Sequence, residues 1–395
     1  MKVVVLDVYS RMGLTIANAL AREHEVIGGA IASGASARVD RTFRTRKLDA
    51  LFRYPSPLRD PTGFGDAVLA ACERYRPDAV FPLTTASVLA LSRLRAERGA
   101  PPGTTFLVED VAAVERLADK WTLHQVCQEL GVPTPRTVLP VGDAAESVHE
   151  LGLPVIAKPR LSEAARGVHV LHTREEVDEL VRNPPTVGTR VGGDAYPYVL
   201  QELVAGEIND ANGCAAAGTV LMSMTLRRVL TRHEFGGNGL VHETTREPEI
   251  AAHLATVMRH FAWNGPLELE FVKAPDGSFS LIDANPRVWG NVQMAIDLGQ
   301  DVASAALAAF TGGPLPEPVL DYPVGTLLRW YTPGTFACCF RAPRTPSAVR
   351  RRLAPLLVPR RGSLSNLRAG DLRHLIGMTL DSSAKRARDA AAPPG

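Results

Sequence analysis

One stretch restricts the fold more than any other, and it covers residues 265–291, GPLELEFVKAPDGSFSLIDANPRVWGN. Within it, two short runs at 267–272 and 278–284 alternate apolar and polar side chains, and a Pro-Asp-Gly sequence at 275–277 separates them. Successive side chains of a strand point to opposite faces. The pattern therefore predicts a β-hairpin with one apolar and one polar face.

The polar face of this hairpin carries a set of oxygen ligands. Glu268 and Glu270 share a face of the first strand, and Asp283 and Asn285 share a face at the end of the second. If those faces coincide, Glu270, Asp283 and Asn285 converge. A hard cation such as Mg²⁺ prefers such ligands, usually with phosphate oxygens completing its shell. Arg287 follows where it can meet an anion. A solvated face with ordinary charges is the alternative.

Length and composition indicate a globular protein. The 395 residues suffice for two or three domains, and contents of 45% hydrophobic and 22% charged residues are ordinary. No apolar run reaches the roughly 18 to 20 residues of a membrane span. Asp7 interrupts the apolar start, which favours a buried first strand over a signal peptide. The five cysteines lack CxxC spacing, so we expect reduced thiols in a cytoplasmic protein.

Charge is distributed unevenly along the chain. From Arg341 onward there are twelve Lys or Arg and three Asp or Glu, an excess of nine positive charges. Because the whole chain carries +2, the rest carries −7. The body therefore has no electrostatic reason to bind nucleic acid. We expect the tail to pack as a C-terminal extension, and docking of a carrier, a nucleic acid, a membrane or another partner is the alternative.

Alternating strands and helices organise the first hundred residues. We expect strands at 3–8, 25–32 and 78–81 and helices at 13–22, 65–76 and 87–98, with a loop rich in Arg and Pro before residue 65. This alternation predicts a parallel sheet with helices on both faces. The first turn contains only Gly13 and lacks GxGxxG, which argues against a dinucleotide-binding enzyme. Residues 82–85 end a strand, so they contact a substrate or cap the next helix.

Two lysines occupy unusual positions further along. A helix beginning near Asp119 and stopping at Gly131 places Lys120 in its first turn, where the helix dipole disfavours a cation. This position suggests that Lys120 faces an anion, and a solvated lysine is the alternative. Lys158 is the only charge in the apolar strand 154–159. Its ammonium needs a partner or loses its proton.

The remaining segments give a coarse secondary structure. A small-residue loop at 162–167, followed by a strand at 168–171, is typical of a hairpin that covers phosphates, although it lacks the Walker A motif. A glycine-rich loop spans 231–246. We expect further strands at 198–204, 213–217 and 220–226, and helices at 175–183, 248–263, 291–299 and 347–358.

Six pieces of sequence now occur in a fixed order. They are DKW at 119–121, ELGVPTP at 129–135, PVIAKP at 154–159, VLQELVAGEIND at 199–210, the strand at 267–272 and DANPR at 283–287. Together they resemble the ATP-grasp superfamily, in the branch of carbamoyl phosphate synthetase and the D-alanine–D-alanine ligases. The resemblance covers about residues 1–315.

The resemblance implies an α/β N-terminal parallel-sheet domain at 1–103. An α+β ATP-grasp domain of two subdomains would follow at 104–315, with the lid subdomain at about 133–202. A small basic C-terminal extension would occupy 316–395, with a disordered end.

The resemblance also implies which residues hold ATP. Lys120 and Lys158 look like the lysines that reach the α- and β-phosphates. The loop from Ser162 to Gly167 resembles the lid over the triphosphate, with bulkier residues than the family usually has. Glu202 and Val204 would form the hinge that reads adenine. Glu207 would be the acid that binds the ribose.

For the metal and the chemistry, the resemblance points back to the hairpin. Glu270, Asp283 and Asn285 match the ligands of Mg²⁺, for which Mn²⁺ can substitute. The family more often has Glu where this chain has Asp283. Arg287 resembles the arginine that meets the γ-phosphate and the acyl phosphate, and Arg228 is a weaker match to a second basic residue.

These roles imply an ATP-dependent carboxylate–amine ligase that forms an amide through an acyl phosphate and releases ADP and phosphate. We expect small-molecule acid and amine substrates, such as amino acids or small peptides, and a homodimer is possible. Activation of bicarbonate, formation of a thioester and a non-catalytic ATP-binding module are the alternatives. Trp289 and His242 would line a substrate pocket, or else pack in the core or lie in an exposed loop. The resemblance assigns no role to Glu268.

Overall fold

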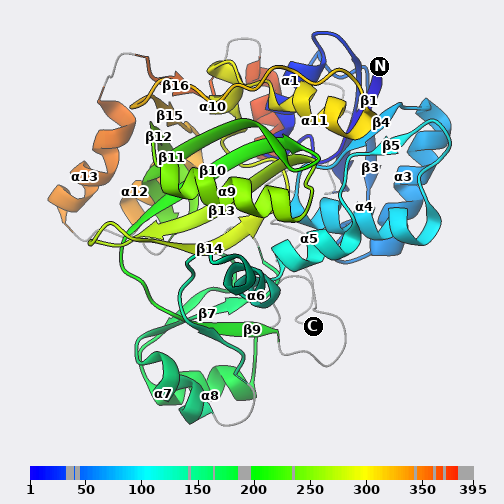
Figure 1. The fold of residues 1–395 in the computed structure, drawn as a ribbon. Helices are drawn as coiled ribbons and strands as arrows, with labels where there is room; N and C mark the ends of the chain where they lie inside the picture. Colours follow the sequence, from blue (N-terminus) through cyan, green and yellow to red (C-terminus); the bar gives the residue numbers. More distant parts are fainter. Residues whose placement is uncertain are drawn as a thin grey trace.

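The computed structural model describes residues 1–32, 40, 45–140, 144–162, 165–185, 197–233, 236–341, 345–358, 362–367 and 371–380. The predicted disordered end and residues 163–164 of the predicted lid loop lie outside this part. Three sheets follow one another along the described chain (Figure 1).

The first sheet is the predicted parallel sheet, with strand order β3-β2-β1-β4-β5. Its strands are β1 (Lys2–Val5), β2 (Glu25–Ile31), β3 (Ala50–Tyr54), β4 (Ala79–Phe81) and β5 (Thr105–Phe106). Its helices are α1 (Gly13–Leu20), α3 (Pro61–Tyr75) and α4 (Thr85–Arg98). The prediction of a loop up to residue 65 is wrong at β3, an edge strand that is only half-buried over most of its length. Four consecutive residues are equally half-buried, so the sequence shows neither the alternation of a strand buried on one face nor the apolar run of a fully buried one.

The second sheet forms a small layer with its own core. Its strands, in the order β6-β9-β7-β8, are all antiparallel to their neighbours: β6 (Thr137–Val138), β7 (Val155–Pro159), β8 (His169–Leu171) and β9 (Tyr198–Glu202). Helices α7 (Ala144–Leu151) and α8 (Arg174–Arg182) pack on it, as the lower part of Figure 1 shows. Two helices precede this sheet, α5 (Val111–Ala118) and α6 (Lys120–Leu130).

The third sheet has seven strands in the order β14-β13-β10-β11-β12-β15-β16. They are β10 (Glu207–Ala216), β11 (Thr219–His233), β12 (Gly236–Thr245), β13 (Gly265–Lys273), β14 (Phe279–Asn285), β15 (Leu327–Arg329) and β16 (Leu364–Ser365). The helices in this part are α9 (Pro248–His260), α10 (Val292–Asp297), α11 (Val302–Thr311), α12 (Pro333–Arg341) and α13 (Pro346–Leu357).

The prediction of a glycine-rich loop at 231–246 is wrong, because most of this segment is strand. β11 continues to residue 233 and β12 pairs with it antiparallel. The glycines make space inside the strand. A Cβ added to Gly239 would lie 2.2 Å from Nε2 of His242, so the histidine ring takes the place of a side chain there.

Part of the basic tail packs on the body of the protein. β15 extends the third sheet beside β12, and β16 pairs with β15. Residues 372–380 are helical, and His374 stacks on Tyr9 of the N-terminal domain with 5.2 Å between ring centroids. Docking of a partner by the tail and the domain limits both stay predictions. Among the described helices, none is long and apolar enough to cross a membrane.

Candidate functional site

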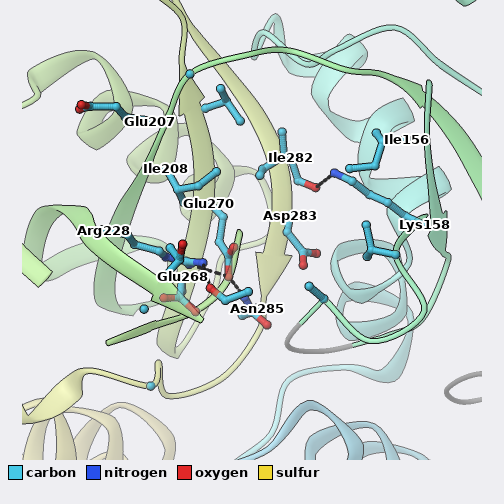
Figure 2. Close-up of a pocket in the computed structure, with 18 of the residues that line it drawn as sticks. Ile156, Lys158, Glu207, Ile208, Arg228, Glu268, Glu270, Ile282, Asp283 and Asn285 are labelled. Carbon is cyan, nitrogen blue, oxygen red and sulfur yellow. Dashed lines mark hydrogen bonds and ion pairs between the residues drawn. The ribbon is translucent and has the colours of Figure 1, made fainter. Parts of the chain in front are cut away.

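A cavity of about 830 Å³ lies where the three sheets meet, and Figure 2 shows part of its lining. It is lined by eleven of the twelve predicted site residues: Lys120, Lys158, Ser162, Glu202, Val204, Glu207, Arg228, Glu270, Asp283, Asn285 and Arg287. The twelfth, Gly167, adopts a positive φ of 73° directly before Val168, which also lines the cavity. Residues separated by more than 160 positions in the sequence therefore share one site.

The hairpin brings its polar residues together as predicted. β13 and β14 pair with Glu270 opposite Asp283 and Glu268 opposite Asn285. Side chains of opposite residues in a strand pair lie on the same face. The Nδ2 of Asn285 donates a hydrogen bond of 3.0 Å to Oε1 of Glu270, as Figure 2 shows. The prediction that these polar side chains share a face is confirmed.

Both lysines reach this hairpin from the opposite side of the cavity. The Nζ of Lys158, on β7, donates to Oε1 of Gln201 at 2.7 Å. It also donates to the carbonyl oxygen of Ile282 at 3.5 Å, as Figure 2 shows. The Nζ of Lys120 lies 3.2 Å from Oδ1 of Asp283. Lys120 therefore faces a carboxylate, as its position at the helix start suggested.

The charge of Lys158 is only partly compensated by the protein. Burial lowers the pKa of Lys158 to about 8, with a further contribution from the charge of Lys120, although Asp283 and Glu270 oppose the shift. The two direct hydrogen-bond partners of Lys158 are neutral. A polyanion placed between the two lysines would restore the favourable charge balance.

A buried ion pair holds the start of α6 against β7. Asp119 caps the helix by accepting from the backbone N–H of Trp121, and its carboxylate also pairs with Arg160 at 2.7 Å. The backbone N–H of Lys120 donates to the carbonyl oxygen of Arg160 at 3.1 Å. This pair fixes the position from which Lys120 reaches the hairpin, and the sequence alone did not reveal it.

Two further acids join the hairpin cluster. Oxygen atoms of Asp210, Glu268 and Glu270 lie within 4.8 Å of one another. Asp210 stands opposite Glu270 across the pairing of β10 with β13. Arg228 holds them together, with Nη2 at 2.6 Å from Asp210 and 2.8 Å from Glu270. The alternating sequence placed Glu268 on this face, but only the pairing of β10 shows that Asp210 belongs there.

The electrostatics of the cluster follow from its burial. Burial and the charges of the neighbouring acids raise the pKa of Glu268 to about 8, against the effects of Arg287 and Arg228. Burial also raises the pKa of Asp210 to about 6, while Arg228 opposes the shift. Burial acts on Glu270 as well, yet Arg228 and Arg287 outweigh it and lower the pKa of Glu270. Glu270 is therefore the acid that stays ionised most readily.

The residues present fit a hard divalent cation. Glu270, Asp283 and Asn285 offer carboxylate and amide oxygens, and the acids close to Glu270 add more oxygens of the same kind. Oxygen-only sets with several carboxylates favour Mg²⁺ or Mn²⁺ over the softer metals that cysteine and histidine bind. The chemistry of this donor set agrees with the ligands that the sequence predicted.

Arg287 connects the hairpin to the N-terminal domain. Its Nη2 donates to Oδ1 of Asn285 at 2.7 Å, and its Nη1 lies 3.7 Å from Oε2 of Glu268. Its Nε donates to Oγ1 of Thr85 at 3.3 Å. The guanidinium is thus held at the edge of the acid cluster, with its orientation fixed from two domains.

The end of β4 contributes in two ways. Thr84 caps α4 by accepting from the backbone N–H of Ser87 at 3.2 Å, which confirms the predicted cap. Thr84 also donates to the buried carboxylate of Asp7 at 3.1 Å and lines the cavity. A contact between residues 82–85 and a substrate stays a prediction.

The residues predicted for adenine and ribose lie at the rim. The side chain of Glu202 is 37% exposed and pairs with Arg136 at 2.9 Å. The side chain of Glu207 is 66% exposed, 3.7 Å from Arg227, and Figure 2 shows it apart from the acid cluster. Of the two aromatic residues with open alternatives, Trp289 is a buried core residue, and His242 is buried and lines the cavity. A contact of His242 with a substrate stays a prediction.

Relatives of known activity match most of the chain at low identity. The carbamoyl phosphate synthase large chain of Methanothermobacter thermautotrophicus is 24% identical over 290 residues, which is 67% of this chain and 27% of that protein. The corresponding protein of Methanoculleus marisnigri is 25% identical over 73% of this chain and 29% of its own length. The chain thus spans under a third of these relatives, and no family model matches the sequence.

Solved structures show the same fold. A biotin carboxylase from Campylobacter jejuni in complex with an ATP analogue has a TM-score of 0.64, with 15% identity over 80% of this chain and 72% of its own. The biotin carboxylase domain dimer of a 2-oxoglutarate carboxylase from Hydrogenobacter thermophilus, with MgADP and bicarbonate, has a TM-score of 0.65, with 15% identity over 82% and 73%.

An L-amino acid ligase from Bacillus licheniformis has a TM-score of 0.59, with 14% identity over 80% of this chain and 75% of that chain. The carboxylases and this ligase differ in what they act on and agree in their fold. Because the order of the motifs, the arrangement of the sheets and these likenesses agree, the chain has the ATP-grasp fold and is similar to enzymes of that superfamily.

Proposed function

We propose that the protein is an ATP-dependent carboxylate–amine ligase that forms an amide bond through an acyl phosphate and releases ADP and phosphate. One observation carries the proposal. Two buried lysines from one side and an acid cluster with two arginines from the other converge on a single cavity. Opposed cations around an all-oxygen metal site suit a triphosphate and a carboxylate that must approach each other.

The nucleotide would lie between the second and third sheets. Lys120 and Lys158 would bind the α- and β-phosphates, and the loop from Ser162 to Gly167 would cover them. Backbone groups near Glu202 and Val204 would read adenine, which makes their side chains less important. Glu207 would bind the ribose from the rim, where its carboxylate is exposed.

Glu270, Asp283 and Asn285 would hold Mg²⁺, or Mn²⁺ in its place. A bound divalent cation would neutralise phosphate charge and lower the barrier for transfer of the γ-phosphoryl group. Arg228 keeps Glu270 ionised and in place through its ion pair of 2.8 Å. Asn285 is oriented from both ends, since it donates to Glu270 and accepts from Arg287.

The chemistry needs two transfers. A carboxylate oxygen of the acid attacks the γ-phosphorus, the bond to the β-phosphate oxygen breaks, and ADP leaves. The amine then attacks the acyl carbon, the bond to the phosphate oxygen breaks, and the amine proton goes to the departing phosphate or to solvent. Lys158 and Arg287 would offset the negative charge of the first step, and the lid would exclude water from the acyl phosphate.

Product analysis tests the proposal. The protein is incubated with ATP, Mg²⁺ and pooled amino acids, and the products are identified by chromatography and mass spectrometry. We expect ADP, phosphate and a new amide that depends on an amine. AMP and pyrophosphate would contradict an acyl phosphate, and ATP turnover that no acid stimulates would contradict ligation.

Activation of bicarbonate is the second candidate, because the neighbouring structures include biotin carboxylases and one contains bicarbonate. This reaction would use the same phosphate-binding residues and the same metal ligands, and bicarbonate would be the acid that is phosphorylated. Isotope-labelled bicarbonate added to the same assay decides between them. Label in the product would favour carboxylation, and an unlabelled amide would favour the ligase.

A further inference from the structure

Arg11 lies in the loop after β1 and reaches the cavity from the N-terminal domain. Its Nη1 donates to the carbonyl oxygen of Gly239 at 2.9 Å, and its guanidinium lies 4.3 Å from the ring centroid of Trp330. Within the described ranges, no carboxylate pairs with it. Its partners are a backbone carbonyl and an aromatic face, which position the guanidinium without neutralising it.

The other arginines of the cavity differ from Arg11. Arg228 is paired with two carboxylates, at 2.6 and 2.8 Å, and Arg287 lies 3.7 Å from Glu268. The charged groups that act on Arg11 are instead Arg232 and Arg228, and together with burial they lower the pKa of Arg11 to about 9. A half-buried cation among cations is unfavourable unless an anion joins it. The local charge therefore favours an anionic ligand.

Two unsatisfied polar atoms lie in the lining of the same cavity. Among the residues that the structure describes, the Oδ1 of Asn291 and the Nδ1 of His242 find no hydrogen-bond partner, although these residues are only 2% and 3% exposed. A Cβ added to the adjacent Gly290 would lie 3.9 Å from Nη1 of Arg11, which brings Asn291 into the same corner. Buried polar atoms nearly always have partners, so those of this corner are ligand-binding candidates.

In the described part of the chain, this corner combines the guanidinium of Arg11, which has no acidic partner, with the amide oxygen of Asn291, which has no donor. Gly290 adds no side chain that would fill the space beside them. A carboxylate suits the guanidinium, and an amino group suits the amide oxygen. The carboxylate of the acid substrate is consumed when it is phosphorylated. A lasting partner for Arg11 must therefore be a carboxylate that the reaction leaves unchanged.

We propose that Arg11 binds the carboxylate of the amine substrate and that Asn291 accepts a hydrogen bond from its amino group, so that the acceptor is an amino acid. This inference rests on the proposed function and adds the class of the acceptor. Gly290 leaves space beside the guanidinium for the acceptor. Arg11 acts as a specificity-determining residue, with no part in phosphoryl transfer.

The experiment compares acceptors with and without the carboxylate. Pooled amino acids and the corresponding pool of amino acid amides are offered as acceptors to the full-length protein with ATP, Mg²⁺ and the acid that the product analysis described under Proposed function identifies. We expect the wild type to prefer free amino acids by about tenfold or more, the range of a charged hydrogen bond. Equal use of the amides would overturn the inference.

Variants then assign the preference to Arg11. Arg11→Gln should raise the KM for the amino acid about tenfold and remove the preference over the amide, while the KM for ATP changes less than about threefold. Arg232→Gln is the matched control, because this exposed arginine contributes charge near Arg11 and does not line the cavity. A preference that persists in Arg11→Gln, or an effect on the KM of the acid alone, would contradict the inference.

Two further experiments distinguish a failure of the acceptor site from a failure of the proposed ligase activity. Hydroxylamine, a small amine without a carboxylate, should trap the acyl phosphate of the wild type as a hydroxamate. Absence of the hydroxamate would refute the proposed ligase, whereas its presence without acceptor discrimination would refute only the acceptor site. Gly290→Ala covers the case in which Arg11→Gln fails to fold. It adds a methyl group in ordinary contact with Arg11, so it should raise the KM for large acceptors more than for glycine.

Discussion

The two sides of the cavity differ in how far the chain satisfies its own charges. On the nucleotide side, formed by Lys120, Lys158 and the end of the hairpin, lysines meet a carboxylate or hydrogen-bond acceptors. On the proposed acceptor side, formed by Arg11, His242 and Asn291, the described residues offer the cation no acid and two buried atoms no hydrogen-bond partner. Paired groups hold their geometry without ligand, whereas unpaired groups depend on a ligand to complete them.

This difference explains why the two sides differ in how far they could be predicted. The nucleotide side uses motifs that recur in a fixed order, and those motifs located both lysines and the hairpin. The acceptor side is assembled from the first loop of the chain, from β12 and from the residues after the hairpin, which carry no motif. A function that depends on substrate identity must therefore be derived from contacts in three dimensions.

The largest effect on turnover is expected from removing Glu270, the acid of the cluster that stays ionised most readily. Glu270→Ala should lower kcat at least about 100-fold, because it removes a proposed metal ligand and leaves Arg228 with one carboxylate. Turnover is measured as ADP release at saturating Mg²⁺. Glu249→Ala on the exposed face of α9 is the control and should match the wild type. Turnover in Glu270→Ala within a few-fold of the wild type would remove the hairpin from the mechanism.

The pH dependence of ATP binding tests the nucleotide side next. The pKa of Lys158 is about 8, so its ammonium is charged below that pH and is lost as the pH rises through it. Affinity for ATP with Mg²⁺ should fall between pH 7 and pH 9, by about tenfold at most. Isothermal titration calorimetry in buffers of different ionisation enthalpy should also detect proton uptake on binding near pH 8.

Glu268 must be separated from Lys158, because its pKa of about 8 lies in the same range. Ionisation of Glu268 adds negative charge near the phosphates, so it would weaken binding in the same direction. In Glu268→Gln the fall in affinity should persist, because Lys158 still loses its charge in this range. In Lys158→Met affinity should be low already at pH 7, and any further fall toward pH 9 then reports the ionisation of Glu268. A fall that disappears in Glu268→Gln would assign the effect to the carboxylate.

The comparison of the two sides predicts that they can be changed independently. Asn291→Ala should leave the affinity for ATP within about twofold of the wild type while it raises the KM for the acceptor several-fold. Lys158→Met should weaken ATP binding more than it raises the KM for the acceptor. Both are measured by calorimetry for ATP and by initial rates for the acceptor. Equal losses for both ligands in Asn291→Ala would show that the two sides form one coupled site.

The fold was predictable where burial leaves a regular pattern. The parallel sheet, the helix from Asp119 to Gly131 and the hairpin all follow from such patterns and their caps. β3 was missed because both of its faces are half-buried and its sequence therefore does not alternate, and β12 was taken for a loop because its glycines resemble a turn. In β12 the glycine at 239 serves the ring of His242, a relation that only the folded chain shows.

The site was predictable to the extent that its residues are close in sequence or belong to a motif. The hairpin residues are neighbours in a strand pair, so alternation alone placed Glu270 with Asp283. Asp210 reaches the cluster through a strand 60 positions away, and its sequence context contains no signal for that pairing. Arg11 is further still from its partners Gly239 and Trp330. Long-range pairing therefore sets the limit of the prediction.

The smallest effect is expected at the rim of the nucleotide side. Glu202 is predicted to act through its backbone, and its side chain forms a partly exposed ion pair with Arg136. Exposed ion pairs contribute little, so Glu202→Gln should change the KM for ATP less than about twofold. Arg136→Gln removes the same ion pair from the other side and is the matched control. If Glu202→Gln weakens ATP binding strongly and Arg136→Gln does not, the carboxylate itself contacts the nucleotide, and the side-chain chemistry of the nucleotide side extends out to its rim.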